Sequence, residues 1–141
     1  MEIRQRSFGV ETGDRFEVHD VAPEVEGSLA ELDATDGLVY VSTPHTSAAL
    51  STNEHEAKLL DDMIETFTRL VPPDDGYAHD RDHVEAGEQP NAHAHLISAM
   101  IKRPVLLVLR DGVLDLGTWE EVLFFELCGP RERAVDVTVL E

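Results

Sequence analysis

Apolar residues along the chain recur with a helical spacing in three stretches. From residue 21 to 32 and from 59 to 71, apolar side chains return every three or four positions, which predicts two amphipathic helices. The second helix is expected to begin near Asn53 and to end at Pro72-Pro73. A third, shorter helix is expected from Asn91 to about Ile101. The pattern therefore predicts about three helices.

Other stretches have the β-branched, aromatic or alternating character of strands. The turn residues Thr12-Gly13-Asp14 lie between the first two expected strands, residues 2–11 and 15–19, and predict a β-hairpin there. Asp111-Gly112 predicts a second hairpin. Because many strands follow one another through tight turns, we predict one α+β domain over residues 1–141 with largely antiparallel sheets. The expected strands cover residues 2–11, 15–19, 37–43, 105–109, 113–116, 121–128 and 134–140.

The charge balance is strongly acidic, with 29 Asp and Glu against 11 Lys and Arg and a formal charge of −18. Such a field repels phosphate backbones and anionic lipids, so neither nucleic acid nor a membrane is an expected partner. The scattered acids are typical of surfaces adapted to concentrated salt, and we expect a halophilic source. No apolar run has the roughly 20 residues of a membrane span, and Met1–Glu11 lacks a signal-peptide core, which predicts a cytoplasmic protein. Cys128 lies in an apolar run and is expected to be buried.

Seven histidines are present, and His45 follows a predicted strand directly. The end of this strand would place the imidazole of His45 at one edge of the sheet, together with the hydroxyls of Thr46 and Ser47. The same histidine could equally be a hydrogen-bonded structural residue.

The third predicted helix carries two more histidines. His95 lies one turn after Asn91 on the same face, whereas His93 is rotated by about 200° and points elsewhere. Leu96 and Met100 are expected to pack on the core. His79 lies in the long segment between Pro72 and Pro90, which is rich in Asp, Glu, Gly and Pro and has no apolar period. Imidazoles from a strand end, a loop and a helix suit Zn²⁺, although these spacings carry no specificity.

Two further segments carry candidate functional side chains: the start of the second predicted helix and the turn at residues 129–131. Asn53-x-x-Glu56 and Ser51-x-x-Glu54 both match the capping box of the second helix. If Asn53 is the cap, Glu54 is free to move a proton or to orient a histidine. In the turn Gly129-Pro130-Arg131, the guanidinium predicts a bound anion, with a salt bridge to a surface acid as the alternative.

Six short motifs, in this order, resemble those of the YjbQ family, also called the secondary thiamine-phosphate synthase family. The resemblance covers residues 2–140. It implies a compact α+β sandwich, a homotrimer with a metal-containing site near the subunit contacts, and a weak thiamine-phosphate synthase activity. The motifs are His45-Thr46-Ser47, Asn53-Glu54, Tyr77-x-His79, Asn91-x-x-x-His95, Gly117-Thr118-Trp119 and Gly129-Pro130-Arg131.

The resemblance also implies roles for single residues. His45, His79 and His95 would hold a divalent metal, with zinc as the first expectation and magnesium as the alternative. Glu54 would move a proton, and Arg131 would bind substrate phosphate and stabilise departing charge. The side chains expected to contact a small phosphorylated substrate are Thr46, Ser47, Asn53, Asn91, Thr118, Trp119 and Arg131. The chain departs from the family pattern at Lys102 (glycine in the family), Glu120 (glutamine) and Cys128 (aspartate).

Three functions stay open on the sequence. The first is a metal-dependent enzyme with secondary thiamine-phosphate synthase activity. The second is a metal-dependent hydrolase of a phosphorylated or amide small molecule, with Glu54 as base. The third is a non-catalytic protein that binds an anionic metabolite through the metal and Arg131.

Overall fold

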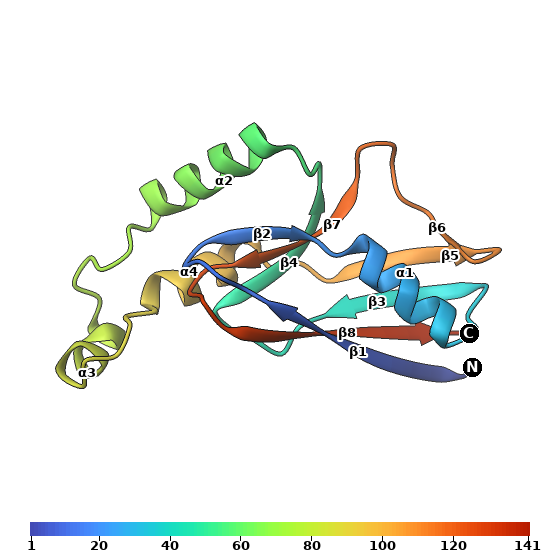
Figure 1. Cartoon of the computed structure of the whole chain (residues 1–141), viewed down its shortest axis with the longest axis horizontal. Helices are drawn as coiled ribbons and strands as arrows, with labels where there is room; N and C mark the ends of the chain where they lie inside the picture. The colour runs from blue at the N-terminus through green and yellow to red at the C-terminus, as the bar shows by residue number, and fades with distance from the viewer.

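The computed structural model describes all of residues 1–141 as two sheets packed face to face, with α2 and α4 on the outer side of the smaller sheet (Figure 1). The larger sheet has the strand order β1-β8-β3-β5-β6 and the smaller one β2-β7-β4. All strand pairs are antiparallel, which confirms the predicted α+β class. The strands are β1 (Ile3–Glu11), β2 (Glu17–Asp20), β3 (Gly37–Ser42), β4 (Ala48–Asn53), β5 (Val105–Arg110), β6 (Val113–Leu114), β7 (Glu121–Glu126) and β8 (Glu132–Leu140).

Four α-helices are present rather than about three. They are α1 (Ala22–Glu31), α2 (Ala57–Leu70), α3 (Arg81–Glu85) and α4 (Ala92–Ile101), and the short 3₁₀ helix η1 (Ala78–Asp80) precedes α3. The prediction missed η1 and α3 because elements of three and five residues are too short to show a helical period. None of the helices has both the length and the apolar character needed to cross a membrane.

The two cores of the protein lie on opposite faces of β7. Val122 and Phe124 belong to the core between the sheets, whereas Leu123 and Phe125 belong to the core under α2 and α4. Because a strand points successive side chains to opposite faces, a strand covered on both sides reads as a continuous apolar run. This explains why the run around Cys128 shows no alternation, and the predicted burial of Cys128 is confirmed.

The predicted hairpin between the first two strands is wrong. The strand β1 pairs with β8 in the larger sheet, whereas β2 pairs with β7 in the smaller one. The chain therefore crosses between sheets at Thr12-Gly13-Asp14, where the Thr12 N–H donates to the Arg131 carbonyl oxygen at 3.0 Å. Turn residues predict that the chain reverses, but they do not determine which strand lies alongside.

The strand β4 was missed, and α2 begins later than predicted. The N-cap of α2 is Glu56, whose Oε2 accepts the Leu59 N–H at 2.7 Å. Asn53 is not the cap, and its Oδ1 accepts the N–H of Glu54. Ala48–Asn53 contains no Val, Ile or aromatic residue, so its local β propensity is low. Its strand conformation therefore comes from six residue pairs with β7.

The predicted core face of α4 is also corrected. Leu96 is 45% exposed and Met100 is 63% exposed, whereas the buried side chains include Ala94, Ile97 and Ser98. The Ser98 hydroxyl donates to the Ala48 carbonyl oxygen at 2.8 Å, so small residues let α4 approach β4 closely. Local spacing predicted the helix but not which side the sheet would cover.

Candidate functional site

Two of the three predicted metal ligands meet where η1 approaches the start of α4. The rings of His79 and His95 lie edge to face, with their centroids 5.1 Å apart. Asn91 Oδ1 lies 3.1 Å from His79 Nε2, and His83 follows one turn later with its ring 5.2 Å from that of His79. The shared face predicted for Asn91 and His95 is thus seen in the structure. His93 points into the core instead, where its Nε2 lies 2.9 Å from the Leu127 carbonyl oxygen.

In each histidine of the cluster, one ring nitrogen forms a hydrogen bond with an oxygen acceptor. His95 Nδ1 lies 3.1 Å from the Thr46 carbonyl oxygen, and His83 Nδ1 lies 3.1 Å from that of His79. A carbonyl oxygen only accepts, so these nitrogens carry the hydrogen and the other nitrogen of each neutral ring has a lone pair. Metal-binding histidines commonly show this arrangement. Even so, no group of three or more His, Cys, Asp or Glu side chains of the chain is placed so that it could hold a metal ion.

His45 lies on the neighbouring turn, but its ring turns toward β8. Its Nε2 accepts the backbone N–H of Ala134 at 2.9 Å, so Nδ1 carries the hydrogen and no ring lone pair is free. Burial lowers the pKa of His45, and the positive charge of Arg133 lowers it further. The imidazole of His45 is therefore a hydrogen-bonded residue of the turn, and the structure leaves no nitrogen of its ring available beside His79 and His95.

The turn that carries His45 has features suited to an anion. The backbone N–H groups of Thr46 and Ser47 have no hydrogen-bond partner within the chain. The ammonium of Lys102 lies 3.0 Å from the Thr43 carbonyl oxygen and 3.4 Å from that of His45. Lys102, Thr46 and His95 line one open pocket of about 460 Å³. Lys102 was not among the predicted site residues, although it is one of only two lysines in the chain.

Arg131 lies near the same turn and has no carboxylate partner. Its Nε donates to the Cys128 carbonyl oxygen at 3.0 Å, and its backbone N–H donates to Thr12 Oγ1 at 2.9 Å. The side chain is otherwise exposed. The salt bridge considered as an alternative is not formed, and the positive charge of Arg131 contributes to the lowered pKa of His45.

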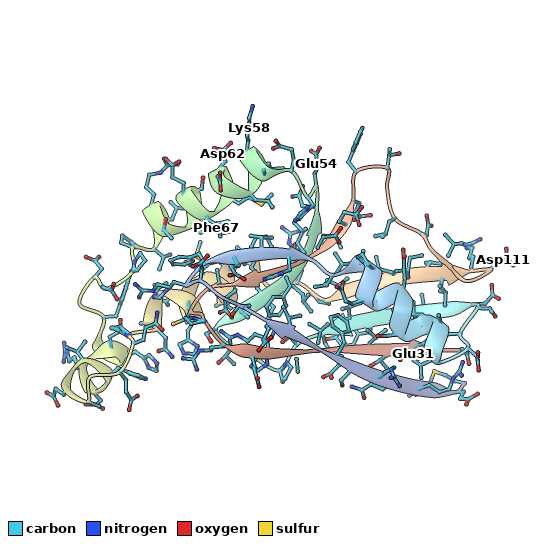
Figure 2. All side chains as sticks on the ribbon, viewed as in Figure 1. Glu31, Glu54, Lys58, Asp62, Phe67 and Asp111 are labelled. Atoms are coloured by element: carbon cyan, nitrogen blue, oxygen red, sulfur yellow. The ribbon has the colours of Figure 1, made fainter.

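The remaining predicted residues lie at the opposite end of β4. In the pairing of β4 with β7, Ala48 lies opposite Glu126 and Asn53 opposite Glu121. Six strand residues span about 20 Å, so Glu54, which Figure 2 labels near the start of α2, is remote from the histidines. Thr118 and Trp119 precede β7 at this same end, and both are exposed. Within one chain, the predicted site residues therefore form two separate groups.

A buried ion pair that the sequence reasoning missed supports the His45 turn. Glu126 is fully buried, and its Oε2 and Oε1 lie 2.8 Å from Nε and 2.5 Å from Nη2 of Arg133. The same Nη2 donates to Ser47 Oγ at 3.1 Å, so the Ser47 hydroxyl is used structurally. The pair thereby links β7, β8 and the turn before β4. The available signal was an acidic residue within an otherwise apolar strand.

The carboxylate of Asp80 holds η1 against the start of α4. Its Oδ1 accepts the backbone N–H groups of Asn91 at 3.0 Å and of Ala92 at 2.8 Å, and the side chain is buried. These are N–H groups that the first turn of a helix leaves without an intrahelical partner. Asp80 therefore determines where His79 lies relative to the helix that carries His95.

Replacing Asp80 by alanine should lower the free energy of unfolding by about 1–2 kcal/mol, because both N–H groups lose their acceptor. Asp80→Asn keeps the acceptor oxygen and should cost less. Urea denaturation measures both changes. The control is Asp75→Ala, an exposed aspartate of the same segment. Equal losses for Asp80→Ala and Asp75→Ala would contradict the anchoring role.

Comparisons with known proteins find similar sequences and structures over nearly the whole chain. The profile of a family described as "UPF0047 protein YjbQ-like" matches residues 6–141. A UPF0047 protein of Archaeoglobus fulgidus is 41% identical over 131 residues, which are 93% of this chain and 97% of the relative. The UPF0047 protein YugU of Bacillus subtilis is 30% identical over 137 residues, 96% of this chain and 98% of the relative. The crystal structure of a hypothetical protein from Aeropyrum pernix K1 has a TM-score of 0.87 and 38% identity, covering 97% of this chain and 98% of that chain.

Proposed function

The chain belongs to the YjbQ-like UPF0047 family, and from this premise we propose that it binds a small phosphorylated metabolite beside a zinc ion. The phosphate would lie against the Thr46 and Ser47 N–H groups and the Lys102 ammonium. Free N–H groups next to a cation suit a phosphate oxygen, and a net charge of −18 makes such a local positive site unusual. This positive turn is the single observation that carries the proposal.

The metal part of the proposal depends on the paired histidines. His79 and His95 fit zinc, because each ring has one nitrogen fixed by an oxygen and the other free. Magnesium fits less well, since it prefers oxygen ligands. One chain supplies only part of a ligand set, with His83 nearby as a third imidazole. When bound, zinc would polarise a phosphate or a water molecule, and the chain's own residues would bind and orient the anion.

Secondary thiamine-phosphate synthase activity remains part of the proposal. That reaction joins a pyrimidine bearing pyrophosphate to a thiazole phosphate, so both substrates carry groups that the positive turn could hold. Arg131, which has no carboxylate partner, would bind the departing pyrophosphate. The alternative of a hydrolase with Glu54 as base has no support within one chain, because Glu54 lies at the far end of β4. A non-catalytic binder would use the same positive turn.

We also propose that the protein assembles as a homotrimer. The outer face of the larger sheet is uncovered and carries large apolar side chains. Leu38 and Tyr40 of β3 are 44% and 40% exposed, and Leu106 of β5 is 58% exposed. Contiguous exposed apolar side chains of this kind often mark subunit contacts. Assembly would also allow the Glu54 end of one copy to approach the histidines of another.

Calorimetric titration tests the metal and anion sites separately. His79→Gln and His95→Gln should weaken zinc binding by at least about tenfold, and the exposed His55→Gln should not. His45→Gln should leave zinc binding intact, because its ring has no free lone pair. Lys102→Gln should weaken pyrophosphate binding, whereas Lys58→Gln on α2 should not.

The outcomes separate the parts of the proposal. Pyrophosphate affinity that is equal in wild type, Lys102→Gln and Lys58→Gln would refute the anion site. Failure of the zinc-loaded protein to form thiamine phosphate from its two precursors would remove the synthase activity and leave a binding protein. Light scattering on the same samples tests assembly, and a monomeric mass would contradict the trimer.

A further inference from the structure

A groove of about 370 Å³ lies between α2, α4 and the free edge of β4, apart from the histidine cluster. The strand β4 pairs only with β7, so its other edge faces this groove and supplies Ser51, Thr52 and Asn53 to the lining. A volume of this size is within the range of small-molecule sites, roughly 300–1,000 Å³. The proposed phosphate site does not involve this groove.

The side of the groove formed by α2 and α4 is apolar. Phe67 projects from the side of α2 that faces the strands, and Lys58 projects away from them (Figure 2). The Phe67 ring lies edge to face with that of Phe125, with centroids 5.9 Å apart. Met63 of α2 and Met100 and Ile101 of α4 also line this side, and Met100 is 63% exposed. Methionine side chains adapt to ligands of varied shape, and no residue of α2 is fully buried, so the apolar side of this helix remains accessible.

The only charged residue in the lining is a cation without a partner. The guanidinium of Arg103 makes no hydrogen bond or ion pair within a chain that has 29 acidic residues. The backbone N–H of Arg103 donates to the Leu50 carbonyl oxygen at 3.2 Å, which fixes the residue beside β4. A planar guanidinium at the edge of an apolar groove suits a carboxylate, which it can bind through two parallel hydrogen bonds.

We propose that this groove binds a small apolar carboxylate, with its carboxylate on Arg103 and its apolar body between α2 and β4. The charge complementarity of Arg103 selects an anion, and the two methionines and two phenylalanines select an apolar body. The polar side chains of β4 that line the groove can donate further hydrogen bonds to the oxygens of the bound carboxylate.

The test uses the full chain labelled with ¹³C at its three methionine methyl groups, and octanoate as the probe. Octanoate should shift the Met63 and Met100 signals saturably and leave Met1 unchanged. Octanol and octylamine, of equal chain length, should bind at least about tenfold more weakly, because they cannot form the charge-assisted pair. Arg103→Gln should weaken octanoate binding by a similar factor. The control Arg110→Gln removes an exposed arginine outside the groove and should have no effect.

Three results would overturn this proposal. One is equal binding of octylamine and octanoate, and another is unchanged affinity in Arg103→Gln. The third is a change of the Met63 and Met100 signals with protein concentration alone, which would show that a second copy of the chain covers the groove. Arg103→Gln leaves the Lys102 ammonium of the proposed phosphate site in place, so the loss of octanoate binding in this variant distinguishes the groove from that site.

Discussion

Replacing Arg133 by methionine is expected to lower the free energy of unfolding by about 3–5 kcal/mol at neutral pH. The substitution leaves the Glu126 carboxylate fully buried and without its cationic partner. Thr12 and the Cys128 N–H still donate to this carboxylate at 2.9 Å each, but neither carries a charge. Urea denaturation followed by circular dichroism measures the loss.

Two comparisons make this result specific to burial. Arg69 on α2 forms an exposed pair with Glu65 at 3.8 Å, and Arg69→Met should change stability by less than about 0.5 kcal/mol. The double variant Arg133→Met with Glu126→Met should recover much of the lost stability, because no unpaired charge remains in the core. If Arg133→Met costs no more than Arg69→Met, the buried pair does not stabilise the fold as described.

The loss in Arg133→Met should also depend on pH. Burial by itself raises the pKa of Glu126, but the hydrogen bonds from Arg133, Cys128 and Thr12 outweigh burial and hold the pKa below its ordinary value. A lowered pKa in the folded state adds stability above the ordinary value, and this stability is lost as the pH falls through the folded pKa. Without Arg133, we expect burial to outweigh the remaining hydrogen bonds and to raise the pKa of Glu126. The stability difference between wild type and variant should therefore shrink as the pH falls from 7 toward 4.

Replacing Gly37 by alanine is the other large expected effect, a loss of about 3 kcal/mol or more. Gly37 opens β3 with a φ of +146°, which L side chains rarely adopt. An added Cβ would lie 2.4 Å from the carbonyl oxygen of Leu140, an atom of the adjacent strand β8. Both the backbone strain and the contact would force β3 away from its partner.

The matched substitution is Gly27→Ala within α1. A Cβ there meets nothing within 4 Å, and alanine is favoured over glycine in a helix interior by roughly 0.5–1 kcal/mol. In denaturation experiments, Gly37→Ala should lower the free energy of unfolding and Gly27→Ala should raise it. A neutral Gly37→Ala would show that the junction of β3 and β8 is looser than the structure indicates.

Features that depend on a few consecutive residues could be read from the sequence. The apolar period predicted α1, α2 and α4, and Asp111-Gly112 predicted the β5–β6 hairpin, because helices and tight turns form through local contacts. The same local geometry separated His95 from His93 and placed His95 on the face of Asn91. The family motifs were sufficient to recognise the family, because each lies within a short stretch of the sequence and does not depend on the fold.

Contacts between distant residues determined the rest of the fold and the arrangement of the candidate site. The strand character of β4 depends on β7, which lies about 70 residues further along the chain, and no local signal predicted it. His45 turns away from the other two histidines because the N–H of Ala134 reaches its ring. Hydrophobic pattern and turn chemistry thus determined most of the elements. The pairing of strands, and the nitrogen that each histidine leaves free, depended on hydrogen bonds made only once the chain had folded.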